Sequence, residues 1–216
     1  SRFLNNLNNK KQVVFDTTKM QMEVVIMKKE LGVNPYLFPM PVLMIATYSD
    51  GDEVNVMNMA WGGICADNMV SLNIEEDHKT SENIKKRGAF TLSIADIPHI
   101  EAADFFGIAT GNKMPDKFER SGLTAVKSEK VDAPIVQEFP LTLECKVVED
   151  KMEVYGHHII GEIIGVLADE SVLDETGKVD VTKLNAFVFD QFRNGYYAIG
   201  EKIGQAWHTG TSLMKK

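Results

Sequence analysis

Short apolar or alternating runs separated by turn residues make up most of the chain, a pattern typical of antiparallel β-structure. Residues 42–48 form a continuous apolar run that predicts a fully buried strand. Asp50-Gly51 follows it and precedes a second apolar run over 53–60, which is a strong signal for a β-hairpin. Residues 69–74 alternate with period two and predict a third strand.

The middle of the chain predicts two short helices. Residues 80–87 form the first, with Thr80 or Ser81 as its N-cap and Gly88 just past its end. Residues 98–107 form the second, because apolar side chains recur there at helical spacing. A strand over 89–94 separates the two helices, and residues 111–122 are predicted as a loop.

The second half predicts strands again. Residues 141–147 alternate, with Leu141, Leu143, Cys145 and Val147 on the apolar face and Thr142, Glu144 and Lys146 opposite. Residues 152–168 form another long strand region, and its three glycines mark bulges or barrel corners. A turn over 174–177 and short strands at 186–189 and 196–199 follow. Roughly seven strands and two short helices predict a mainly β, closed or nearly closed antiparallel barrel.

Length and composition fit one compact protein. A barrel of this type with 216 residues commonly forms a single domain, so residues 30–216 are expected to form one domain behind a polar lead-in over 1–29. One short element is expected within this lead-in, at 22–27. A net charge of −8 argues against nonspecific nucleic-acid or membrane binding.

Cysteine usage and hydropathy predict a cytoplasmic protein. Cys65 and Cys145 lie far apart in sequence and form no metal or redox motif, so two reduced thiols are expected. No apolar run reaches the roughly 18 residues needed to cross a bilayer. The polar start of the chain is no intact secretory signal.

Residues 55–64 are the first candidate for ligand binding. Met57, Met59 and Trp61 lie in this stretch, and Gly62 and Gly63 follow as a predicted turn. Thioethers suit the flat face of an aromatic ring, and glycines let a backbone approach a ligand closely. The alternative is a plain buried strand that ends in a tight turn.

The second candidate is an anion site at His78-Lys79-Thr80-Ser81. A helix start presents free N–H groups and partial positive charge, while Lys79 adds a full charge and Asn83 lies one turn further. The alternative is a capped surface helix that binds nothing. The basic run at 85–87 is also placed where it could hold an anion.

Other familiar sites are excluded. The sequence has no GxGxxG after a strand, no GxxxxGK[ST], no GxSxG and no HExxH. His157 and His158 are adjacent on a strand and therefore point to opposite faces, so no metal site is predicted. A soft flat surface beside an anion site matches the two ends of flavin mononucleotide (FMN).

An ordered set of short motifs identifies a family resemblance. The sequence resembles the flavin reductase-like FMN-binding proteins, and within them the flavoredoxin branch, over residues 30 to 205. The motifs that carry this are 41–47 (PVLMIAT), 50–51 (DG), 55–61 (NVMNMAW), 79–84 (KTSENI), 88–90 (GAF), 116–118 (DKF), 121–124 (SGLT), 143–146 (LECK), 160–163 (IGEI) and 200–201 (GE).

The resemblance implies a split β-barrel that dimerises, with FMN near the subunit interface. It implies that the backbone of 58–63 lines the isoalloxazine and that Lys79, Thr80 and Asn83 hold the phosphate and ribityl chain. The 113–118 loop and the 196–202 segment would border the site. The cofactor-binding residues expected are Thr47, Asn58, Met59, Ala60, Trp61, Gly62, Gly63, His78, Lys79, Thr80, Asn83, Lys113 and Lys202.

The sequence departs from the family pattern at two places. Gly62-Gly63 stands where relatives often carry a larger or hydroxyl residue. Relatives also often place a histidine where this chain has Gly156, and only His158 shares strand parity with that position. His158 is therefore the one candidate catalytic residue.

Three functions follow as hypotheses. The first is an FMN-dependent oxidoreductase that accepts a hydride from NADH or NADPH. The second is an electron carrier that passes electrons through FMN to a redox protein partner, to which an acidic surface would help it dock. The third is a flavin-binding or degenerate barrel without redox duty.

Overall fold

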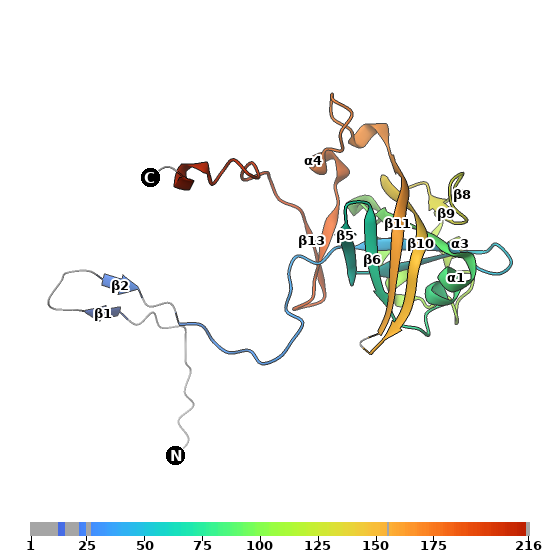
Figure 1. Ribbon diagram of the computed structural model, residues 1–216, viewed down its shortest axis with the longest axis horizontal. Coiled ribbons are helices and arrows are strands. Elements are labelled where there is room, and N and C mark those ends of the chain that lie inside the picture. The colour runs from blue at the N-terminus through green and yellow to red at the C-terminus, as the bar shows by residue number, and fades with distance from the viewer. Residues whose placement is uncertain (1–12, 16–21, 25–26, 155, 215–216) are drawn as a thin grey trace, which may run out of the picture. The chain divides into compact units, whose positions relative to one another are not determined.

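The computed structural model describes residues 13–15, 22–24, 27–154 and 156–214. The chain divides into two units, Ser1–Tyr36 and Leu37–Lys216. In the first unit β1 (Val13–Phe15) and β2 (Met22–Val24) pair antiparallel (Figure 1). The element expected at 22–27 is thus a strand of three residues in its described part.

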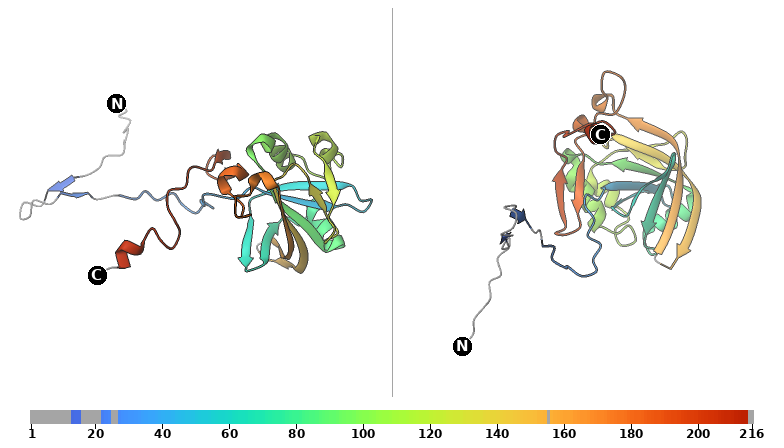
Figure 2. Two further views of the ribbon diagram at one scale, coloured as in Figure 1. Left: turned by 90° about the horizontal axis from the view of Figure 1, so that it is seen from above. Right: turned by 60° about the vertical axis from the view of Figure 1, so that its left-hand side comes forward.

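The second unit is organised around a seven-stranded sheet in which every neighbouring pair is antiparallel. The sheet curls into the half-barrel visible in Figures 1 and 2, which confirms the predicted mainly β split-barrel fold. In spatial order its strands are β4 (Val54–Met59), β3 (Leu43–Tyr48), β7 (Ala89–Ile94), β10 (Leu141–Glu153), β11 (Gly156–Ala168), β6 (Met69–Ile74) and β5 (Gly62–Ala66).

The predicted hairpin at Asp50-Gly51 is confirmed. Leu43 lies opposite Met59 and Tyr48 opposite Val54, and the Ser49 amide donates to the Glu53 carbonyl at 2.9 Å to close the turn. The apolar run of β3 is buried along almost its whole length, as predicted. This hairpin delivers the end of β4 to one edge of the sheet.

The prediction of a glycine turn at residues 62–63 is wrong. Gly62 and Gly63 begin β5, and the chain turns before them, at Ala60 and Trp61. A Cβ atom on Gly62 would come within 2.7 Å of the Ser71 carbonyl oxygen. Glycine at this position therefore allows β5 to pack closely on β6. It does not form the turn that reverses the chain.

The helices match the predictions in place but differ at their ends. α1 (Lys79–Arg87) is capped by His78 instead of Thr80 or Ser81, and it ends at Gly88 in the left-handed conformation, with φ of 65°. Thr80 lies inside the helix, and its hydroxyl accepts from Asn55 at 2.9 Å. η1 (Ile97–His99) and α2 (Ile100–Ile108) form the second predicted helix.

Part of the predicted loop over 111–122 is helical. α3 (Lys117–Ser121) forms there because Phe118 is buried and stacks on Phe106, with ring centroids 6.3 Å apart. The remaining elements are β8 (Ala125–Lys127), β9 (Pro134–Val136), η2 (Glu170–Val172), α4 (Val181–Leu184), β12 (Phe187–Asp190), β13 (Gly195–Ala198) and η3 (Thr211–Met214).

Residues 141–147 of β10 alternate as predicted, but buried residues lie on both faces of the strand. Cys145 is buried in the core, where Leu143 and Val147 pack beside it, and Glu144 is buried on the opposite face. The register shift at this point leaves the extra residue, Ile164, on the neighbouring strand β11. Ser128 donates its hydroxyl to Glu144 at 2.6 Å, and Thr142 shares a hydrogen bond of 2.8 Å with Ser93. The polar face of this strand is therefore packed against protein.

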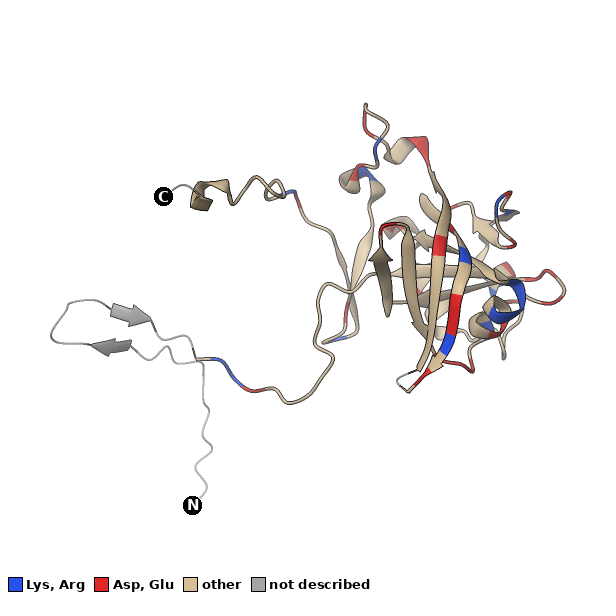
Figure 3. Ribbon diagram, viewed as in Figure 1, with Lys and Arg blue, Asp and Glu red and all other residues tan. Residues whose placement is uncertain are grey.

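Charged residues are spread over the second unit, and basic ones gather in the last turn of α1 (Figure 3). Lys86 pairs with Asp50 and Glu82, and Arg87 pairs with Asp52 and Asp132. Among the described residues, the helices are all too short or too polar to traverse a bilayer.

Candidate functional site

Two adjoining cavities lie between the end of β4, the start of α1 and the helix α2. The first, called the wide cavity, has a volume of about 590 Å³ and is lined by Met57, Asn58, Met59, Ala60, Trp61, Asn73, Ile74, Glu75, His78, Asp104, Gly107, Ile108, Gly156, Phe189 and Tyr196. The second, the narrow cavity, has about 140 Å³ and is lined by Asn55, Met57, Asn58, His78, Lys79, Thr80, Phe106, Gly107, Ile108, Ala109, Thr110, Gly111 and Lys117. Their five shared residues make them one branched site.

The wall between β4 and α2 is held by Asn58. Its side-chain amide donates to the Ala103 carbonyl at 2.9 Å and to the Tyr196 hydroxyl at 3.4 Å. Gly107 of α2 faces Asn58, and a Cβ atom there would lie in ordinary contact, 3.5 Å from the Cβ of Asn58. Asn58 thus fixes the boundary that both cavities share.

The far side of the wide cavity carries a small polar network. The Tyr196 hydroxyl accepts from Asn58 and donates to Asp104 at 2.9 Å. Burial, together with the hydrogen bond to Asp104, raises the pKa of Tyr196 to about 12. The phenol therefore stays protonated at neutral pH, and its hydrogen-bonding capacity is used within the protein.

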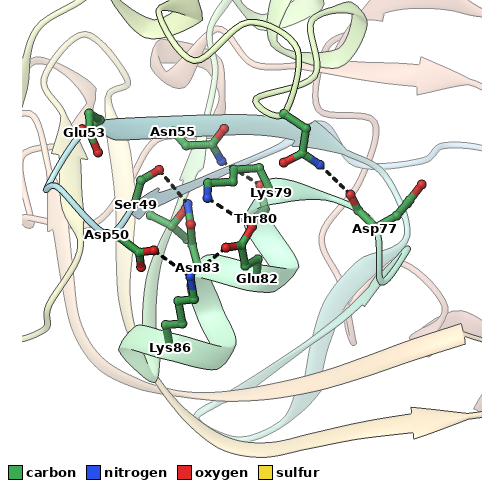
Figure 4. A network of polar contacts seen from close by, with 12 residues as sticks. Ser49, Asp50, Glu53, Asn55, Asp77, Lys79, Thr80, Glu82, Asn83 and Lys86 are labelled. Atoms are coloured by element: carbon green, nitrogen blue, oxygen red, sulfur yellow. Dashed lines mark hydrogen bonds and ion pairs between the residues drawn. The ribbon is translucent and has the colours of Figure 1, made fainter.

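The narrow cavity opens at the start of α1. His78 makes no side-chain hydrogen bond to the helix, so the first backbone N–H groups are left without a cap. Asn55 donates to the Thr80 hydroxyl at 2.9 Å, which fixes both side chains at the entrance (Figure 4). Such a helix start attracts anions through its free N–H groups and its dipole.

Two buried polar atoms beside the narrow cavity have no hydrogen-bond partner among the described residues. They are Oδ1 of Asn55 and Nδ1 of His78. A Cβ atom on Gly111 would overlap this Asn55 oxygen and come within 3.0 Å of the Lys79 Cβ. Buried polar groups are usually paired, so a ligand bound in this corner could supply the missing partners.

Two lysines give the narrow cavity its positive charge. Lys79 is bonded to Glu82 at 3.1 Å and remains partly exposed. Lys117 is only 3% exposed, donates to the Ala109 carbonyl at 3.0 Å, and forms no ion pair with a carboxylate of the described residues. Burial lowers its pKa to about 8. A buried ammonium with one neutral partner favours an incoming anion.

Comparison with known proteins identifies the chain. The family model described as "Flavin reductase like domain" matches residues 36–192. The chain belongs to the flavin reductase-like family. Flavoredoxin of Desulfovibrio vulgaris (Miyazaki F) is 36% identical, with a TM-score of 0.81, over 85% of this chain and 100% of that protein.

Two further relatives place it more closely. Flavoredoxin from Methanosarcina acetivorans is 27% identical, with a TM-score of 0.78, over 87% of this chain and 100% of that one. An uncharacterized protein of Pyrococcus abyssi is 30% identical over 64% of this chain and 79% of its own length. This flavin reductase-like protein falls in the flavoredoxin branch.

About half of the predicted cofactor residues of this flavin reductase-like protein line the site. Asn58, Met59, Ala60 and Trp61 line the wide cavity, Lys79 and Thr80 line the narrow one, and His78 and Asn58 line both. Thr47 and Asn83 lie outside both linings. Both are buried where α1 packs on β3, and Asn83 of the helix donates to Thr47 of the strand at 3.0 Å, which fixes α1 on β3.

Four other predicted residues also lie outside the two linings. Gly62 and Gly63 lie in β5, where Gly62 faces the sheet interior and a Cβ on Gly63 would meet open space. Lys113 belongs to an exposed turn, and Lys202 donates to Gln205 in the exposed C-terminal segment.

The histidine pair on β11 is divided as expected. His157 is buried and bonded to Asp150, while His158 is half-buried and lies opposite Asn73 in the sheet. Neither lines the two cavities. In the described part of the chain no three His, Cys, Asp or Glu side chains come together as a metal site.

The basic run at 85–87 does not form the anion site that the sequence suggested. Arg87 donates to the Ser49 carbonyl and is paired with two aspartates, at the opposite end of α1 from the narrow cavity. Lys117 takes its place as the second cation of the site. Sequence reasoning named the 113–118 loop but missed this residue, since its burial depends on the packing of α3.

Proposed function

We propose that this protein binds FMN, with the isoalloxazine in the wide cavity and the ribityl phosphate in the narrow one, and acts as a flavin-dependent oxidoreductase. Membership of the flavin reductase-like family supports flavin redox chemistry as the general class. The observation that carries the proposal is the junction of a broad apolar cavity with a small cation-lined cavity at an uncapped helix start.

The wide cavity suits a planar ring. Met57, Met59 and Trp61 supply polarizable and aromatic surface, and the volume falls within the range of small-molecule sites. The backbone of 58–61 runs along the same wall, where it can meet the polar edge of a flavin.

The narrow cavity suits a phosphate and the hydroxyls next to it. Lys117 and Lys79 would neutralise the phosphate, and the first amides of α1 would donate to it. The unpaired Asn55 oxygen would accept from a ribityl hydroxyl. The residues present therefore fit the group.

Bound FMN would supply hydride and electron transfer, and the protein would supply binding and orientation. Asn58 would hold the shared wall in place through its bonds to Ala103 and Tyr196. Asp104 would fix the orientation of the Tyr196 hydroxyl by accepting its hydrogen bond. No side chain of this chain is required as a general acid in this scheme.

We propose NADH or NADPH as the electron donor and a homodimer as the working assembly. Exposed apolar residues on the long strands β10 and β11 support a second copy as a partner; they are Val148, Ile164, Val166 and Leu167. Burying such a surface favours association.

A second candidate function is electron transfer through bound FMN to a redox protein. The net charge of −8 favours this, since it would steer the protein toward a basic partner. Slow turnover with nicotinamides and fast, salt-sensitive exchange with a basic redox protein would distinguish this function from the first.

The test starts with purified protein incubated with FMN and freed of excess ligand. We expect a retained flavin absorption band that bleaches on anaerobic addition of NADH or NADPH. A protein that stays colourless refutes FMN binding. A band that is retained but never bleaches refutes the nicotinamide step and leaves the carrier function.

A further inference from the structure

The two cavities of the site have opposite charge. Lys79 and Lys117 line the narrow cavity, and none of the described residues of its lining is Asp or Glu. Asp104 and Glu75 line the wide cavity, and among the described residues of that lining none is Lys or Arg. The charge of the lining is therefore positive in the narrow cavity and negative in the wide cavity.

The polar network leaves Asp104 available to a ligand. Tyr196 donates to Oδ1 of this carboxylate, and the Tyr196 hydroxyl also accepts a hydrogen bond from Asn58. An ionised carboxylate has several acceptor positions, so capacity remains after one hydrogen bond. Asp104 is half-buried and Glu75 exposed, which places a strong acceptor inside the cavity and a second negative charge nearer solvent.

We propose that the wide cavity selects by charge the planar ring that a second ligand inserts into it, accepting rings that are neutral or cationic and that donate an N–H or O–H to Asp104. This inference rests on the proposed function, because it takes FMN to fill part of the same site. Asp104 is then a specificity-determining residue that contacts the ligand. Glu75 adds to the repulsion of anions, and Tyr196 acts by positioning Asp104.

Three near-isosteric probes separate charge from shape. Benzoate, benzamide and benzamidine carry charges of −1, 0 and +1 on the same ring, and only the last two donate N–H bonds. Their dissociation constants are measured with FMN-loaded protein, from the perturbation of the flavin absorption spectrum. A charge about 6 Å away across partly solvated protein changes affinity by about tenfold, so benzoate should bind at least about tenfold more weakly than benzamide.

The decisive variant is Asp104→Asn, whose side-chain oxygen can still accept from Tyr196. It should shrink the benzamide preference over benzoate to about twofold and weaken benzamidine. Glu129→Gln is the matched control, since it removes one negative charge from an exposed residue outside both linings. It should leave all three constants unchanged.

The outcomes separate this inference from the proposed function. A wild-type protein that fails to retain FMN refutes the proposed function. Retained FMN with equal affinity for the three probes, or with no binding of any of them, overturns the charge selection alone. A preference that persists in Asp104→Asn, or that falls equally in Glu129→Gln, also overturns the role of Asp104.

Discussion

Lys117 should dominate the affinity for FMN although it is not one of the residues that the sequence pattern marked. Its ammonium is buried, has the Ala109 carbonyl as its neutral partner, and faces the narrow cavity. A charge-assisted hydrogen bond contributes about 1.5–3 kcal/mol. Lys117→Met should therefore weaken FMN binding by roughly 10- to 150-fold.

The pH dependence of binding gives this prediction a sharper form. Burial lowers the pKa of the free amine to about 8. Below that pH the site already holds its proton and affinity is full; above it, binding a phosphate must first take up a proton. The dissociation constant should thus rise about tenfold between pH 7 and pH 9.

Titrations of flavin fluorescence between pH 7 and pH 9 measure this rise. Lys117→Met should give a flat profile, because no proton uptake remains. Lys79→Met is the matched control, since it removes the other lysine of the cavity. Its dissociation constant should still rise between pH 7 and pH 9. A wild-type profile that is flat, or a Lys117→Met profile that rises like the wild type, contradicts the assignment.

The same burial affects the ligand-free fold. The amine titrates at about 8 in the folded protein and at its ordinary 10.5 in the unfolded chain. Between these values the unfolded state binds more protons, so this group makes the fold more stable as the pH rises through that window. In urea unfolding, the wild type should have a higher free energy of unfolding at pH 9.5 than at pH 7.5 from this group. Lys117→Met should lack this increase.

Three further predictions concern other parts of the fold. Gly62→Ala should destabilise the fold by about 1–3 kcal/mol in urea unfolding, because its Cβ meets backbone, whereas Gly63→Ala should change stability by less than about 0.5 kcal/mol; equal effects would contradict this. Arg87→Gln should lower the urea midpoint more at low salt than at high salt and leave FMN affinity unchanged. A thiol reagent should label the exposed Cys65 in the native protein and reach Cys145, whose pKa burial raises to about 12, only on unfolding.

Local pattern was enough to predict the elements whose burial follows from their own sequence. β3 was predicted from a continuous apolar run, β6 from its period-two alternation and β7 from its short apolar run after the first helix, and Gly88 marked the end of α1 correctly. β5 was missed because it has little periodic signal and begins with two glycines.

The parts of the site that escaped prediction depend on contacts between distant residues. Tyr196 belongs to a segment that was expected to border the site, but its hydrogen bond to Asp104 spans 92 positions of sequence. Lys117 is buried where α3 packs Phe118 on Phe106. The helix start at residue 79 was predictable as an anion site, since free N–H groups and a lysine are local features. The second cation, Lys117, could not be predicted, because its position beside the helix start depends on tertiary packing.

The corner at Ala60 and Trp61 has a consequence for how the protein folds. It joins β4 and β5, which are the two outermost strands of the sheet, although only these two residues separate them in sequence. Both outermost strands take their native places in one sheet only when the five intervening strands have all paired. Because both corner residues line the wide cavity, a partly folded chain has no complete site. Flavin binding should therefore appear in a single late step of refolding. The amount of bound flavin would then report the fraction of fully native molecules.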